Sequence, residues 1–259
     1  SYLGELFGNA EGAATVYDFL ARFETKDVHA SIFDEYIKAT VSVATAEKML
    51  DTVYFEFTGP KGAKIVRTES YSLPTAVAKA VAHVGYTTEF PAVSGRAVFT
   101  EFAPSADGKS VPSVISAYYG ITDNKVHNQG ATKAVFETIG QSFEPSDLTT
   151  YDQEFNVPAQ KINKIVGTNN AGSCADPNNC VEAELDVQVM TAIAQDGVTW
   201  FWSIPGTESF LEWAMAVAST ADAPKVHSIS YGAPETEIGN SQAKSFGTEV
   251  QKLGTMGIT

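Results

Sequence analysis

The stretch Glu182-Ala-Glu-Leu-Asp-Val-Gln-Val-Met-Thr-Ala-Ile-Ala194 is apolar around most of its circumference, which predicts a largely buried helix. A few residues later, Val198-Thr-Trp-Phe-Trp-Ser203 is rich in β-branched and aromatic residues and predicts a buried strand. Apolar strands that alternate with single helices are typical of a parallel sheet with helices on both faces. This part of the chain is therefore expected to have an α/β fold.

The same alternation extends from residue 111 to residue 259. The expected helices are residues 112–119, 132–139, 146–155, 182–194, 208–219 and 242–253. The expected strands are residues 161–166, 198–203, 226–230 and the segment from Met256 onward. Together they predict a doubly wound parallel sheet.

Residues 1–92 have a different order of elements and are expected to form a separate unit. The expected helices are residues 13–23, 44–52 and a segment after Pro74, and the expected strands are 28–32, 38–43, 54–58 and 64–69. Helices mixed with antiparallel strands suit a ferredoxin-like α+β sandwich. Residues 93–110 are rich in turn-forming residues and predict a linker between the two units, with an ordinary surface loop as the alternative.

Glu182 and Asp186 are four residues apart and therefore lie on the same face of the expected helix. If that face is buried, two close carboxyl groups cannot both be charged cheaply, and we expect the pair to share a proton. Such a pair suits acid–base chemistry. The alternative is a pair of acidic residues on a solvated helix N-terminus, where the helix dipole favours them. Glu184 lies on another face and is expected to contact solvent or a partner.

Composition narrows the classes of partner. The chain has 259 residues, 44% of them hydrophobic, which is enough for two compact units. It carries 31 acidic against 17 basic residues and a formal charge of −14, so nucleic acids and anionic membrane surfaces are not expected partners. No apolar run approaches the roughly 18 residues that span a bilayer.

The two cysteines, Cys174 and Cys180, flank a short loop of turn-forming residues. The loop brings the thiols within reach of each other, which favours a disulfide and an oxidising compartment. The alternatives are two free thiols or half of a metal site. No histidine or further cysteine lies nearby in the sequence, so no metal site is predicted in this chain.

Several ordered motifs resemble the sedolisins, a family of serine-carboxyl peptidases. The segment Glu182-Ala-Glu-Leu-Asp-Val-Gln188 resembles the signature helix of that family. Further motifs follow in the family's order, and two earlier ones resemble its propeptide: Thr199-Trp-Phe-Trp-Ser-Ile-Pro-Gly206, Phe210-Leu-Glu-Trp213, Val226-His-Ser-Ile-Ser-Tyr-Gly232, Val111-Pro-Ser-Val-Ile-Ser-Ala-Tyr-Tyr119, Ala46-Glu-Lys-Met-Leu50 and Ser70-Tyr-Ser-Leu-Pro74. The resemblance implies a propeptide in residues 1–92, an activation site in 93–110, and the N-terminal part of a subtilisin-like peptidase domain in 111–259.

The resemblance also implies roles for individual residues. Glu182 is expected to be the general base that activates a nucleophilic serine, and Asp186 is expected to orient it. The residues expected to contact the peptide substrate are Ser203, Gly206, Ser230, Tyr231 and Gly232. Ala233 departs from the tripeptidyl members of the family, which carry an acidic residue there, so the choice between endopeptidase and tripeptidyl-peptidase activity stays open.

The chain contains no Ser-Gly-Thr-Ser segment, which carries the nucleophile in sedolisins. The nucleophile, the oxyanion-stabilising aspartate and the family's Ca²⁺ site are therefore expected in a C-terminal part of the same peptidase, and no cofactor is expected in this chain. The expected partners are that part and a peptide or protein substrate. The resemblance implies a secreted, lysosomal or vacuolar protein that acts in acid. The alternative is a catalytically inactive sedolisin-derived protein that binds or inhibits.

Overall fold

The computed structural model describes residues 8–31, 34–59, 64–90, 110–128, 130–204, 209–234 and 238–259. The chain divides into two compact units. The first consists of Ser1–Ala92, Ala214–Ala221 and Pro234–Gln251, and the second of Val93–Trp213, Asp222–Ala233 and Lys252–Thr259. The predicted linker, 93–110, lies outside the described residues except for Ser110, so its role stays a prediction.

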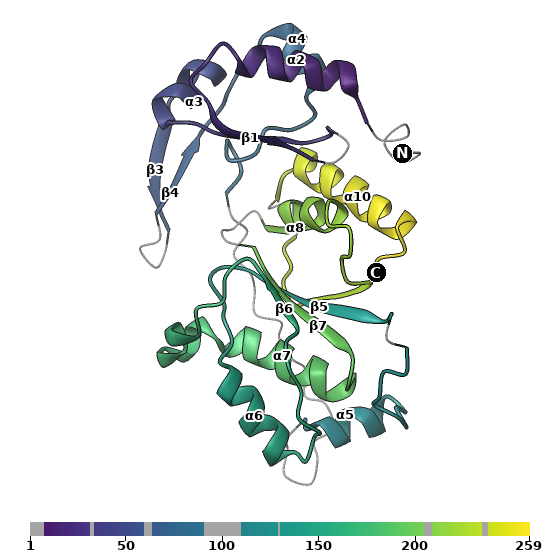
Figure 1. The fold of residues 1–259 in the computed structure, drawn as a ribbon. Helices are drawn as coiled ribbons and strands as arrows, with labels where there is room; N and C mark the ends of the chain where they lie inside the picture. The colour runs from purple at the N-terminus through teal and green to yellow at the C-terminus, as the bar shows by residue number, and fades with distance from the viewer. Residues whose placement is uncertain are drawn as a thin grey trace. The chain divides into compact units, whose positions relative to one another are not determined.

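The first unit contains helices and two antiparallel strand pairs (Figure 1). Its helices are α2 (Ala10–Leu20), α3 (Val43–Leu50) and α4 (Thr75–Ala80), together with the end of α8 (Ser209–Ala218) and most of α10 (Asn240–Thr255). Its strands are β1 (Lys26–Ala30), β2 (Ile37–Thr40), β3 (Tyr54–Thr58) and β4 (Lys64–Thr68). Strand β1 pairs with β2, and β3 pairs with β4. The sequence predicted these elements to within about three residues, whereas a single ferredoxin-like sheet stays a prediction.

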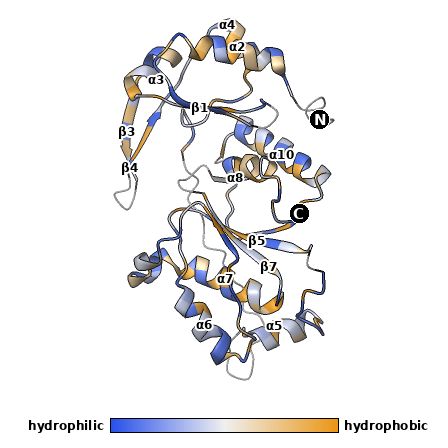
Figure 2. Ribbon diagram, in the orientation of Figure 1, coloured by the Kyte–Doolittle hydropathy of each residue, from blue (hydrophilic) through white to orange (hydrophobic). Residues whose placement is uncertain are grey.

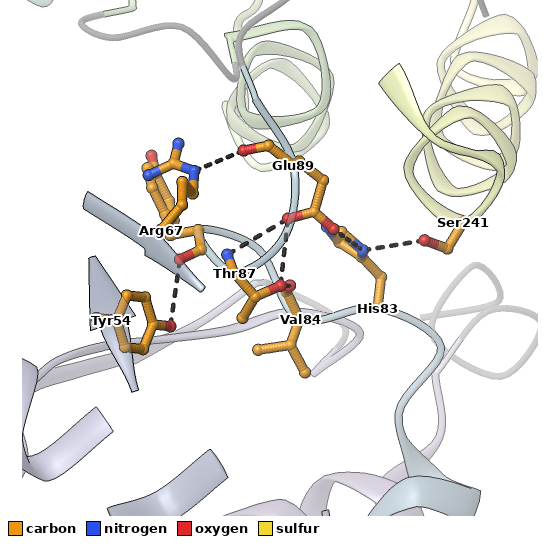
Figure 3. Close-up of polar contacts among 8 residues, drawn as sticks. Tyr54, Arg67, His83, Val84, Thr87, Glu89 and Ser241 are labelled. Atoms are coloured by element: carbon orange, nitrogen blue, oxygen red, sulfur yellow. Dashed lines mark hydrogen bonds and ion pairs between the residues drawn. The ribbon is translucent and has the colours of Figure 1, made fainter. Parts of the chain in front are cut away.

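A polar network fixes the segment that ends the described part of this unit at residue 90 (Figure 3). The Glu89 carboxylate accepts hydrogen bonds from the backbone and hydroxyl of Thr87 and lies 3.5 Å from Nδ1 of His83. The Arg67 guanidinium donates to the Glu89 carbonyl at 2.6 Å. The segment is thereby tied to β4 by side chains that are mostly buried.

The second unit is built on a four-stranded parallel sheet with the strand order β6–β7–β5–β8. Its strands are β5 (Thr132–Glu137), β6 (Lys164–Val166), β7 (Val198–Ser203) and β8 (Val226–Ile229). Its helices are α5 (Pro112–Tyr118), α6 (Pro145–Glu154) and α7 (Val181–Ile193), with the start of α8 (Ser209–Ala218) and the end of α10 (Asn240–Thr255). The short helices η1 (Ala171–Ala175) and η2 (Pro177–Asn179) precede α7.

Alternate residues of the strands form a core on each face of this sheet. On one face, Val135 and Phe201 pack with Val187 of α7 and Leu148 of α6. On the other face, Phe136 packs with Trp213, Phe210 and Tyr231. Figure 1 shows α6 and α7 on the same face of the sheet, and Figure 2 shows hydrophobic residues along its strands. The predicted α/β fold is confirmed at this level, while the subtilisin-like assignment stays a prediction.

The helix predicted at residues 132–139 is wrong, because this segment is the central strand β5. Lys133-Ala-Val-Phe-Glu137 is a short apolar run with no clear period, and such runs do not distinguish a strand from a buried helix. Pairing with β7 and β8 makes it a strand, and Ala134, Val135 and Phe136 are all fully buried in the centre of the sheet.

The strand predicted from Met256 onward is reduced to a single paired residue. The Thr259 N–H donates to the carbonyl of Lys225, and the Thr259 carbonyl accepts from the N–H of His227, as in a parallel ladder beside β8. Among the described residues, no helix combines the length and apolar composition required to cross a membrane.

Candidate active site

The candidate site lies at the carboxyl edge of the parallel sheet. Strands β7, β5 and β8 are neighbours and run in the same direction, so their last residues meet at one edge. Glu137 ends β5, Ser203 ends β7, and Ser230 and Tyr231 directly follow β8. Ligands of open α/β sheets bind outside this edge, where backbone groups and side chains converge.

Asp186 projects from α7 toward the residues after β8. The Ser230 hydroxyl donates a hydrogen bond of 2.7 Å to its Oδ1. Burial raises the pKa of the Asp186 carboxyl to about 6; the Ser230 bond opposes this shift and the charge of Glu182 adds to it. This carboxyl therefore titrates in the weakly acidic range.

Glu137 is a second carboxyl group of the site, and the sequence did not predict it. It is fully buried, and the Tyr231 hydroxyl donates to its Oε2 at 2.6 Å. Burial raises the pKa of Glu137 to about 9, although the Tyr231 bond lowers it; the charges of Asp186 and Glu182 raise it further. Glu137 is therefore protonated at neutral pH. It was missed because the strand that ends with it was predicted as a helix.

The carboxyl groups of Glu137 and Asp186 influence each other's pKa. Glu137 Oε1 and Asp186 Oδ2 are both buried, and neither oxygen has a partner within hydrogen-bond geometry. Their interaction raises the pKa of Glu137 and lowers the pKa of Asp186, so the proton resides on Glu137 before it resides on Asp186. The sequence expected a proton shared between Asp186 and Glu182, which stays a prediction; the structure adds Glu137 as a third carboxyl group with a raised pKa.

Glu182 lies in the first turn of α7, one helical turn before Asp186, as the spacing predicted. Its side chain is partly exposed, and its charge acts on both other carboxyl groups by repulsion. Its backbone N–H donates to Oε1 of Gln141 at 3.2 Å. Glu182 is thus more exposed than Glu137 and sits at a helix N-terminus, where a negative charge is favoured.

The sequence suggested that Glu184 contacts solvent or a partner. In the structure its carboxylate binds groups of this chain instead. It is half buried and accepts hydrogen bonds from the Glu144 N–H and from Nε2 of Gln188. Glu144 is the N-cap residue of α6, so Glu184 ties α7 to the start of α6.

The predicted disulfide between Cys174 and Cys180 is confirmed. It closes the loop of η1 and η2 directly before α7. Gln141 also binds this loop, because its Nε2 donates to the Asn178 carbonyl at 2.7 Å. The start of the helix that carries Glu182 is therefore held from two sides.

The residues predicted to contact substrate have different surroundings. Ser203 is buried, and the Ser230 and Tyr231 side chains bind the acidic cluster, so any contact of these three with a peptide involves mainly their backbone. Gly232 follows in the same segment, and Gly206 lies outside the described residues. Substrate binding stays a prediction. Within the described ranges, no group of three or more His, Cys, Asp or Glu side chains has the arrangement of a metal site.

Comparisons with known proteins give a consistent result. The Pro-kumamolisin activation domain matches residues 3–90, the region predicted to be a propeptide. Tripeptidyl-peptidase 1 of Pongo abelii and of Homo sapiens are each 28% identical to this chain over 263 residues, and that of Macaca fascicularis is 29% identical over 249 residues. These alignments cover 95%, 95% and 89% of the chain, but 45%, 46% and 43% of the relatives.

The chain thus spans less than half the length of the curated relatives that it matches. The match to the activation domain falls in the first unit, while the carboxyl cluster lies in the second. The relatives align across both. The activation-domain match and the relatives together support a sedolisin-family proenzyme, to whose N-terminal part this chain is similar.

Proposed function

We propose that this chain contains the propeptide and the first part of the peptidase domain of an acid-acting serine-carboxyl peptidase. The observation that carries the proposal is the cluster of Glu182, Asp186 and Glu137 at the carboxyl edge of a parallel sheet. The subtilisin-like and ferredoxin-like folds expected from the sequence belong to this proposal.

In the proposed mechanism, Glu182 is the general base. It accepts the proton of a serine hydroxyl that a C-terminal part of the peptidase supplies, and the serine oxygen attacks the carbonyl carbon of the peptide bond. A positioned base of this kind contributes about 10²–10⁴-fold to the rate. Asp186 orients Glu182, while the Ser230 hydroxyl holds Asp186 by a hydrogen bond.

The arrangement of protons favours an acidic optimum. Glu182 must be charged to accept a proton, whereas the buried Glu137 behind it retains its proton at acidic and neutral pH. Asp186 can hold a second proton only below its pKa of about 6. If activity requires that proton, the upper limit of the active pH range lies near 6. A secreted, lysosomal or vacuolar compartment agrees with this chemistry and with the disulfide. A Ca²⁺ site in the C-terminal part and a peptide or protein substrate complete the proposal.

The test uses the complete peptidase, in which this chain is joined to its C-terminal part. The pH dependence of hydrolysis of an unstructured peptide is measured for the wild type, Glu182→Gln and Asp186→Asn. We expect an optimum below pH 7, a loss of about 10²–10⁴-fold in kcat for Glu182→Gln, and a smaller loss for Asp186→Asn. Glu154→Gln is the matched control, because Glu154 is exposed at the end of α6.

Full activity of Glu182→Gln, or an optimum above neutrality, contradicts the mechanism. A complete wild-type protein that binds peptides without cleaving them supports the alternative of an inactive binding or inhibitory protein. Intact mass of the natural protein distinguishes a longer peptidase from a product of 27.7 kDa.

A further inference from the structure

A tight turn of Thr138, Ile139, Gly140 and Gln141 follows the buried acid Glu137 and contacts the start of α7. The Gln141 N–H donates to the Thr138 carbonyl at 3.1 Å, which closes the turn. The Gln141 side chain then accepts the N–H of Glu182 at 3.2 Å. The turn therefore begins at one carboxyl residue of the site and ends in contact with another.

Ile139 adopts a left-handed conformation, with φ of 49°. Among the described residues, seven that are not glycine have a positive φ, and five of these are Asp or Asn, which tolerate this region. The other two are Tyr86 and Ile139. For a β-branched residue this conformation is a genuine outlier, because its branched Cβ crowds the backbone.

Tyr86 has contacts that account for its conformation. The Arg67 guanidinium lies 5.4 Å from the centre of its ring, and the Tyr54 hydroxyl donates to its carbonyl. The Ile139 side chain, in contrast, is 49% exposed. Burial in a core therefore does not explain why an isoleucine occupies a position that glycine or asparagine would adopt with less strain.

Strained residues concentrate at ligand-binding and active sites, where the fold retains them for function. Ile139 lies at the carboxyl edge of the sheet, two residues after Glu137, on the turn that binds the backbone of Glu182. An exposed branched hydrocarbon held rigidly at this position is suited to contact an apolar side chain of an extended peptide.

We propose that Ile139 is a specificity-determining residue that contacts an apolar side chain of the peptide substrate close to the bond that is cut. This inference rests on the proposed peptidase function and deepens it, because it assigns peptides with an apolar residue at one position as the preferred substrate class. The contact acts on the choice of substrate and leaves the proton transfer by Glu182 unchanged.

The test compares the complete wild-type peptidase with Ile139→Asn and Ile139→Gly. The substrates are peptides that carry Leu, Asn, Lys or Glu at each position around the cleaved bond in turn. We expect the wild type to prefer Leu at one position, measured as a ratio of kcat/KM values, and both variants to reduce this ratio about tenfold. Removal of the strain should at the same time raise the urea midpoint of both variants.

Val226→Ala is the matched control, because Val226 is 52% exposed and begins β8 at the opposite edge of the sheet. It should leave the preference unchanged. An equal loss of kcat/KM for all peptides, or an unchanged ratio at every position, overturns the role of Ile139 while the peptidase function stands. A complete wild-type protein that cleaves none of the peptides overturns both.

Discussion

The hydroxyl of Tyr231 donates a hydrogen bond of 2.6 Å to the buried carboxyl group of Glu137. The two residues are 94 positions apart, and they lie at the carboxyl ends of the adjacent strands β8 and β5. Asp186 of α7 accepts a hydrogen bond from Ser230, the neighbour of Tyr231, and its charge raises the pKa of Glu137. The segment after β8 therefore binds both acids, one on β5 and one on the helix that carries the proposed base.

Replacement of Tyr231 by Phe should destabilise the second unit, because the buried Glu137 carboxyl loses its donor. The expected loss in the free energy of unfolding is about 1–2 kcal/mol. All three tryptophans lie in the second unit, so tryptophan fluorescence during urea unfolding reports on this unit. Tyr119→Phe is the control, because Tyr119 is 65% exposed. Equal midpoints for Tyr231→Phe and the wild type would refute the contribution of the bond.

Glu137 should make the second unit less stable as the pH rises. Its pKa is raised from 4.5 to about 9 in the folded chain, so the folded state holds a proton that the unfolded state has lost. Its stabilisation is present below pH 4.5 and declines as the pH rises toward 9. Between about pH 6.5 and 7.5 the free energy of unfolding should fall by nearly 1.4 kcal/mol, the change per pH unit when the folded state binds one more proton than the unfolded state.

In the interval from about pH 6.5 to 7.5, the pH dependence of stability comes mainly from Glu137 and little from other buried groups. Burial lowers the pKa of His227 to about 4 and the pKa of Lys133 to about 8, so His227 acts mainly below this interval and Lys133 mainly above it. Glu137→Gln should remove most of the decrease in unfolding free energy with pH across this interval, whereas Glu154→Gln should retain it. An unfolding free energy of the wild type that is constant or increases across the interval would contradict a buried proton on Glu137.

The sequence predicted the helix of Glu182 and Asp186 because a long apolar segment has a strong signal. It also predicted β3 and β7 at the observed residues, since aromatic and β-branched residues dominate both. It failed at β5, where five residues from Lys133 to Glu137 fit a helix as well as a strand. Only pairing with β7 and β8, which are distant in the sequence, makes this segment a strand.

The same dependence on distant residues explains why part of the site was missed. An acidic residue at the end of a mispredicted helix appears solvated, and nothing in the local sequence indicates that Glu137 is buried. Its burial follows from Tyr231 and Asp186, which lie far along the chain. The pairing of Cys174 with Cys180 was predictable because the loop between them is short.

Removal of the disulfide by Cys174→Ala and Cys180→Ala together should lower the free energy of unfolding by about 2 kcal/mol, as chain entropy predicts for so short a loop. The loop precedes α7, so the loss should appear in the tryptophan signal of the second unit. Addition of a reductant to the wild type should reproduce the loss, and addition to the double variant should have no effect. Two reactive thiols in the unfolded, unreduced wild type would contradict the bond.

Gly167 should be the glycine of the second unit that is most sensitive to substitution. It follows β6 with φ of +82°, and a Cβ at this position would overlap the carbonyl oxygen of Ser203, the last residue of β7. Gly120 provides the matched control, because its φ is +67° and nothing lies within 4 Å of its Cβ position.

Gly120→Ala should lower the free energy of unfolding by about 1 kcal/mol, the cost of a left-handed residue. Gly167→Ala should cost about 1–3 kcal/mol more, because β6 and β7 must separate to admit the methyl group. Urea midpoints from tryptophan fluorescence measure both, and equal losses would show that β6 does not approach Ser203 as closely as the structure describes.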